Sequence, residues 1–126
     1  MKNLIYILIS ILLLSVVGCS SNQQVTSSTF AFTEEKEKDL QKVAYQSLSN
    51  SIKKEIIDEE QGKVSGFKSG SELEVFNNIN SNTIDIKDTQ TILVNFTTKE
   101  KSKFKSINVY LEKNGEKVLG FLTENK

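Results

Sequence analysis

The sequence predicts an α+β domain in which one N-terminal amphipathic helix, continuous or kinked, packs on an antiparallel meander of four to five strands. Apolar residues recur at helical spacing between residues 34 and 61, and two-residue alternation dominates the last third of the chain. We expect a single α+β domain at residues 33–126. A cleaved signal peptide, residues 1–18, and a lipidated cysteine with a flexible tether, residues 19–32, are expected before it.

The first eighteen residues have the composition of a lipoprotein signal peptide. Lys2 supplies a positive start, and residues 4–17 are almost continuously apolar. As a helix this run would span about 21 Å, short of the ~30 Å hydrocarbon core of a membrane, so it is typical of a signal peptide rather than of a membrane span. Its end matches the lipobox of signal peptidase II, made of Val16, Val17, Gly18 and Cys19.

We therefore expect cleavage before Cys19, which would carry S-diacylglycerol and N-palmitoyl groups and hold the chain on the outer side of the cell membrane. The alternative is an uncleaved anchor with an incidental buried cysteine. Residues 20–32 carry no charge and are mostly polar, with a few apolar side chains among them. This composition predicts a flexible tether. Phe30 and Phe32 are expected to dock on the domain, with a direct membrane contact as the alternative.

A helix is predicted after the tether. Thr33 can cap it, and its first turn carries Glu34, Glu35 and Glu37, which the helix dipole favours. We expect Gly62 to end it, and Ser49–Ser51 either to kink it or to divide it in two. The residues that form one apolar stripe are Leu40, Val43, Ala44, Leu48, Ile52, Ile56 and Ile57.

Strand signals follow the helix. Asn114-Gly115 predicts a type I′ hairpin between the last two strands, because both turn positions need a positive φ. Residues 97–105 form a longer charged connection, and residues 77–82 read as a loop. The candidate strands are residues 63–67, 73–76, 83–86, 91–96, 107–111 and 118–122.

The composition excludes several kinds of site. The chain has no His, Pro, Trp or Arg and a single Cys, which excludes an ordinary zinc site, a His-activated nucleophile and an internal disulfide. After Lys2 is removed, fifteen lysines face sixteen acids, so no clustered basic face for nucleic acid is predicted. We expect no catalytic residue, no metal and no cofactor.

Four residues are candidates for contact with a partner. Lys99, Lys101 and Lys103, together with Lys105, form a basic loop that could contact anionic lipid headgroups or wall polymers. The alternative is a solvated hairpin tip that guards strand edges. Tyr110 lies on the strand face opposite Ile107, Val109 and Leu111, and we expect it to point outward.

Two further groups have open interpretations. The acidic cluster of Glu55 and Asp58–Glu60 could bind Ca²⁺ or a cationic partner, although the residue spacing of a calcium loop is absent, or it could pair with nearby lysines. The aromatic residues could line a ligand groove between helix and sheet or simply form the core. These aromatic residues are Tyr45, Phe67, Phe76, Phe96, Phe104, Tyr110 and Phe121.

Two stretches within a span of about 80 residues resemble the small uncharacterised, YhfM-like lipoproteins of the Gram-positive genus Bacillus and its relatives. The first holds Ala44-Tyr45, Leu48-Ser49, Lys53, Ile56-Ile57-Asp58 and Gly62-Lys63-Val64; the second holds Thr91, Val94, Phe96, Thr98-Lys99, Ile107, Val109-Tyr110-Leu111-Glu112 and Val118-Leu119-Gly120. The resemblance implies a helix-plus-sheet domain similar to cystatin-like or PepSY-like folds, and it transfers no catalytic residue. The chain departs from the family at Lys105-Ser106, where a Gly-Pro pair is expected.

Three functions remain open from the sequence. The leading prediction is a membrane-anchored, non-enzymatic surface module that binds a protein or envelope component. The alternative is a small carboxylate-dependent hydrolase or ligand-binding lipoprotein that uses Glu72, Glu74 or Asp85 in the cleft between helix and sheet, with at least one raised carboxyl pKa. The third possibility is a spacer without pocket or partner.

Overall fold

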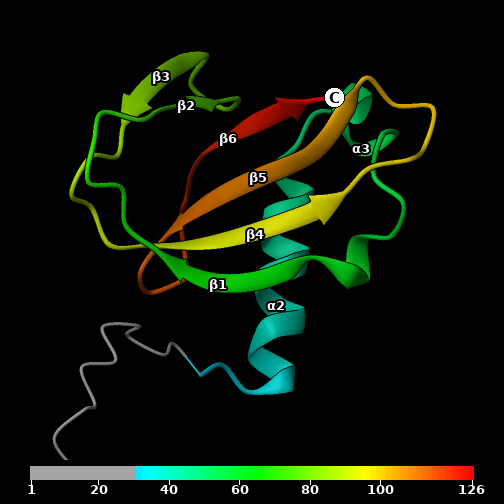
Figure 1. Ribbon diagram of the computed structural model, residues 1–126. Helices are drawn as coiled ribbons and strands as arrows, with labels where there is room; N and C mark the ends of the chain where they lie inside the picture. The colour runs from blue at the N-terminus through cyan, green and yellow to red at the C-terminus, as the bar shows by residue number, and fades with distance from the viewer. Residues whose placement is uncertain (1–30) are drawn as a thin grey trace, which may run out of the picture.

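One main helix crosses one face of a six-stranded antiparallel sheet in the computed structural model, which describes residues 31–126 (Figure 1). The α+β class is confirmed, but the expected count of four to five strands is wrong. The strands are β1 (Lys63–Phe67), β2 (Glu74–Asn77), β3 (Asn82–Asp85), β4 (Thr91–Thr97), β5 (Phe104–Glu112) and β6 (Val118–Asn125).

The sheet is also more than a meander, because its spatial order is β1-β4-β5-β6-β2-β3. The runs β4-β5-β6 and β2-β3 follow the order of the chain, whereas β1 and the β2–β3 hairpin join the sheet out of that order. The β2–β3 hairpin joins the far side of β6 through the pairing of Phe76 with Phe121, and β1 joins β4. The two outer strands are therefore β1 and β3, each paired on one side only.

The predicted helix is divided. The helix α2 (Glu34–Gln46) begins at Thr33, whose Oγ1 accepts a hydrogen bond from the backbone amide of Lys36, as the sequence predicts. It ends far before Gly62 because Ser47 Oγ donates to the carbonyl of Ala44 at 2.6 Å and Ser49 adopts an extended conformation. A short helix α3 (Asn50–Lys53) and a 3₁₀ turn η2 (Glu59–Gln61) then lead to β1.

The face of the sheet that meets α2 carries the larger core. Alternate residues of β4 and β5 point toward the helix and are fully buried, and Phe32 packs against the same cluster, as expected for this end of the tether. Phe30 lies outside the described residues. The buried members are Leu40, Ala44, Leu48, Ile56, Ile92, Val94, Phe96, Ile107, Val109 and Leu111.

The opposite face of the sheet has a second, smaller core. Val75 of β2 and Ile86, just after β3, pack on Tyr110 of β5. Phe67 at the end of β1 also contacts Tyr110, with ring centroids 5.2 Å apart. Around Tyr110 both faces of β5 are thus covered, one by α2 and the other by the segment around the β2–β3 hairpin.

The turn between β5 and β6 is not type I′. Five residues, 113–117, separate the two strands, whereas a type I′ hairpin has a two-residue loop. Among these five residues only Gly115 has a positive φ, of 76°, and its amide donates a hydrogen bond to the carbonyl of Glu112. A Cβ at Gly115 would lie 2.6 Å from a methyl group of Leu40, so this turn also packs closely against α2.

We predict that Gly120→Ala destabilises the fold. The new Cβ would lie 2.7 Å from the carbonyl oxygen of Phe76 and 2.8 Å from Val75, forcing β2 away from β6. A cost of about 1–3 kcal/mol in the free energy of unfolding is expected. Gly70→Ala is the matched control, because nothing lies within 4 Å of its added Cβ. Urea unfolding that finds the two variants equally stable would contradict the close approach of β2 and β6.

Candidate binding surface

A set of polar side chains lies on the sheet face opposite α2, at the end where β4 terminates. Strand register places Lys63, Asn95 and Asn108 side by side across β1, β4 and β5, and it places Thr97, Ser106 and Glu124 side by side across β4, β5 and β6. Their neighbours along the strands, such as Val94 and Phe96, point to the helix instead. We call these six residues the polar half-face.

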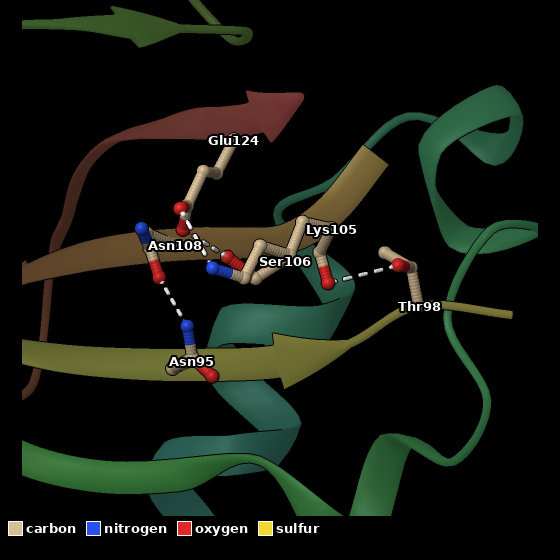
Figure 2. Close-up of polar contacts among 6 residues, drawn as sticks. All are labelled: Asn95, Thr98, Lys105, Ser106, Asn108 and Glu124. Carbon is tan, nitrogen blue, oxygen red and sulfur yellow. Dashed lines mark hydrogen bonds and ion pairs between the residues drawn. The ribbon is translucent and has the colours of Figure 1, made fainter. Parts of the chain in front are cut away.

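Hydrogen bonds join the polar half-face across three strands, as Figure 2 shows. Asn95 Nδ2 donates to Asn108 Oδ1, and Ser106 Oγ donates to Glu124 Oε2 at 3.1 Å. The other carboxylate oxygen of Glu124 lies 3.4 Å from Lys105 Nζ. Lys105 reaches this face because a register shift lies between Phe104 and Ser106.

The central amide pair keeps hydrogen-bonding capacity for a ligand. Asn95 Oδ1 and Asn108 Nδ2 make no side-chain hydrogen bond to another of residues 31–126, and both residues are half-buried. An acceptor and a donor on neighbouring strands, whose backbones lie about 5 Å apart, match the N–H and C=O groups along an extended peptide. The arrangement can bind an amide-bearing ligand, and Lys63 and Glu124 add one charge of each sign at its sides.

Sequence reasoning did not single out Asn95 or Asn108. The available signal was two asparagines at the non-core positions of adjacent strands, where this residue type is unfavourable. Finding them together needs the register of β4 against β5, which the alternation of each strand alone does not fix.

The structure contradicts the prediction that Tyr110 points outward. Tyr110 does lie on the face opposite Ile107, but only 4% of it is exposed, because Val75 and Phe67 cover it. The same burial raises the pKa of its phenol. Tyr110 is therefore a core residue of the second face and is not grouped with the predicted lysines.

The predicted lysines Lys99, Lys101 and Lys103 lie together and exposed in the connection between β4 and β5. This connection covers residues 98–103 and is shorter than expected, because the strands extend into both of its ends. Two of its own residues, Thr98 and Ser102, are buried.

The acidic cluster forms no ion pair with any of residues 31–126. The ion pairs within residues 31–126 are Lys38–Glu34 and Lys105–Glu124, so pairing of Glu55 or Asp58–Glu60 with nearby lysines is not observed. Asp58 instead caps η2, its Oδ1 accepting from the amide of Glu60 at 2.9 Å. Nowhere in the described part of the chain are three or more acidic or cysteine side chains grouped to hold a metal ion.

The carboxylates of the alternative function do not lie between helix and sheet. Glu72, Glu74 and Asp85 are exposed on the β2–β3 hairpin and the loop before it. Asp85 Oδ1 accepts hydrogen bonds from the amides of Lys87 and Leu73, at 3.0 and 3.1 Å, and these bonds lower its pKa below the ordinary 3.8. A general acid needs the opposite shift.

The surface has hollows beside α2. The larger one, about 680 Å³, lies between α2 and the α3–η2 segment, with Tyr45 and Lys53 in its wall. Lys53 Nζ lies 5.3 Å from the centre of the Tyr45 ring, and that ring packs edge-on against Phe96. A second hollow of about 520 Å³ lies between α2 and the β2–β3 turn. The aromatic residues thus contribute mainly to the cores, with Tyr45 also lining a hollow.

We predict that Asp85→Asn weakens the fold near neutral pH and that the difference from the natural chain disappears in acid. Because the folded-state pKa of Asp85 is lowered, its stabilising contribution is present above pH 3.8 and is lost as the pH falls through the lower folded-state value. Denaturant unfolding from pH 7 to 2 measures this, with the exposed Glu74→Gln as control for net charge. A difference that stays constant down to pH 2 would argue against the two amide hydrogen bonds as its cause.

No helix among residues 31–126 is long and apolar enough to cross a membrane. The signal peptide and the lipobox, including Cys19, lie outside the described residues. Comparisons with protein families, curated proteins and solved structures found no match to the chain. The resemblance to YhfM-like lipoproteins therefore stays a prediction from sequence motifs.

Proposed function

We propose that the chain is a membrane-anchored lipoprotein whose domain is a non-enzymatic module that binds a protein or another amide-bearing envelope component through the polar half-face. The observation that carries this proposal is the Asn95–Asn108 pair. It offers an unused acceptor and donor on a half-buried sheet surface. A polypeptide segment is the simplest ligand that presents both complementary groups.

The anchor is supported by the lipobox that ends in Cys19 and by the position of Phe32 in the sequence. Phe32 packs against the core, so the polar segment from residue 20 to residue 31 separates the lipidation site from the domain. Fully extended, the chain from Cys19 to Phe32 reaches about 45 Å. This length allows the domain to present different surfaces outward while it stays on the membrane.

The first prediction concerns the anchor. Cys19→Ala should abolish incorporation of labelled lipid and leave the uncleaved precursor, because the thiol is the acceptor of the diacylglyceryl group. Thermal unfolding of the domain should be unchanged, since the tether separates residue 19 from the core. The measurement is metabolic labelling with fatty acid followed by fractionation and intact mass. Unchanged labelling in the variant would exclude Cys19 as the lipidation site.

The second prediction concerns the polar half-face. Asn95→Ala combined with Asn108→Ala should reduce capture of a saturable partner from envelope extracts at least tenfold, because roughly 1 kcal/mol is lost for each of two hydrogen bonds. Capture is measured by quantitative mass spectrometry on the immobilised full-length lipoprotein.

The matched control is Asn78→Ala combined with Asn80→Ala in the exposed β2–β3 turn, where the side-chain amides make no hydrogen bond within the described residues. Both double variants remove two side-chain amides, and the first also removes the hydrogen bond from Asn95 to Asn108. Equal capture by both double variants, at the level of the natural chain, would remove the polar half-face as the binding surface. Capture no better than that by an unrelated Cys-anchored protein would remove the module function itself.

A further inference from the structure

Two segments that are far apart in sequence meet where β4 ends. Ile56 and Thr98 form an antiparallel bridge. Beside it, the amide of Ile57 donates to the carbonyl of Thr97 at 3.1 Å, and the amide of Lys99 donates to the carbonyl of Glu55 at 2.8 Å. These bonds place Ile57, which is 58% exposed, next to the loop between β4 and β5.

Side-chain hydrogen bonds fix the backbone of the loop between β4 and β5. Thr98 Oγ1 donates to the carbonyls of Phe104 and Lys105, and Ser102 Oγ accepts from the amide of Phe104 at 3.1 Å. Lys126 Nζ donates to the carbonyls of Lys99 and Glu100 at 3.2 and 2.6 Å. Figure 2 shows the bond from Thr98 to Lys105. Because these bonds fix the backbone, a partner that contacts the loop side chains has little backbone entropy to remove.

The fixed loop, and the segment after α3 that is bonded to it, present positive charge. Lys54, Lys99, Lys101 and Lys103 are exposed and form no ion pair with another of residues 31–126, although Lys103 Nζ lies 5.0 Å from the ring centre of Phe104. Glu100 is the acid of the loop. The other nearby acids are the half-buried Glu55, Asp58, which caps η2, and Glu124, which pairs with Lys105. Glu59 and Glu60 of η2 follow Asp58 in the chain and are exposed.

We propose that the docking patch, made of Lys54, Ile57, Lys99, Lys101 and Lys103, rests on the anionic lipid surface of the membrane that holds the anchor. Exposed lysines on the loop and on the segment that carries the exposed Ile57 match phosphate headgroups above acyl chains. This inference rests on the anchored lipoprotein of the proposed function. It adds an orientation to the tethered domain. The end of the sheet where β4 terminates faces the membrane, and the polar half-face is directed sideways.

The tether is long enough for this arrangement. In Figure 1 the loop between β4 and β5 lies near α3, at the far end of α2 from Thr33. Thirteen helical residues extend about 20 Å, whereas the extended segment from Cys19 to Phe32 reaches about 45 Å. The docking patch therefore reaches the lipid surface from an anchor at the other end of the helix.

The tether also makes weak docking sufficient. One lysine beside an anionic bilayer favours the bound state roughly fivefold, so the net three positive charges left by the four lysines and Glu100 contribute roughly a hundredfold. That is too little for stable binding by a free domain, but anchoring makes the contact intramolecular and raises its effective concentration.

Lysine acetylation tests the inference. Lipoprotein purified from bacteria that express the full chain is reconstituted into vesicles of phosphatidylglycerol and phosphatidylcholine, or of phosphatidylcholine alone. It is then briefly exposed to a water-soluble acetylating reagent. Acetylation of Lys54, Lys99, Lys101 and Lys103 should be several-fold slower on anionic vesicles. Lys68, Lys113 and Lys117, at the other end of the sheet, should react equally on both.

Two triple variants that lose the same charge distinguish an effect of the docking patch from an effect of net charge. Lys99→Gln, Lys101→Gln and Lys103→Gln together should remove the protection of Lys54, whereas Lys68→Gln, Lys113→Gln and Lys117→Gln should preserve it. Equal acetylation on both vesicle types, or protection spread evenly over all lysines, would overturn the proposal. So would equal protection by soluble polyphosphate without vesicles, because the patch would then be a site for a free polyanion.

Intact mass shows beforehand whether Cys19 carries lipid, which separates a failure of the proposed anchor from a failure of the docking patch. If the cysteine carries no lipid, the proposed function fails. The chain is then coupled through this thiol to a maleimide lipid, and the same acetylation rates decide whether the patch docks.

Discussion

The structure depends on the burial of β5 on both faces. Ile107, Val109 and Leu111 are fully buried under α2, and Tyr110 is buried beneath Val75 and Phe67 on the other side. A strand covered twice in this way cannot shift by one residue, because each side chain would move to the opposite core. The register of β5 in turn fixes its neighbours β4 and β6, and so aligns the side chains that form the polar half-face.

The elements of the fold follow closely from the sequence. Residues 63–67 form a strand as predicted, and Thr33 caps α2. The order of the strands could not be predicted in this way. Pairing of β1 with β4 and of β2 with β6 is a long-range choice that period-two alternation does not encode. The second core was missed for the same reason, and the error about Tyr110 followed from it.

The candidate site was less predictable than the fold. The basic loop is visible as a run of lysines, and the structure adds that Ile57 lies beside it through main-chain bonds from a segment about forty residues away. The polar half-face is invisible in any one strand, because Asn95 and Asn108 are ordinary solvent-side residues until the register places them together. The two proposals thus both depend on the pairing of β4 with β5. This pairing places the two asparagine amides together on the sheet and the lysine loop at its end.

The outer position of β1 has a consequence for crowding. Anchored proteins, as we propose this one to be, diffuse in two dimensions, and neighbouring copies meet far more often than they would in solution. A strand with one free edge then favours edge-to-edge pairing between copies and fibre growth. The strand has only five residues, contains Gly66 and carries Lys63. A short edge with a charge and little side-chain area is a poor template, so the domain can be abundant on a surface without polymerising through this strand.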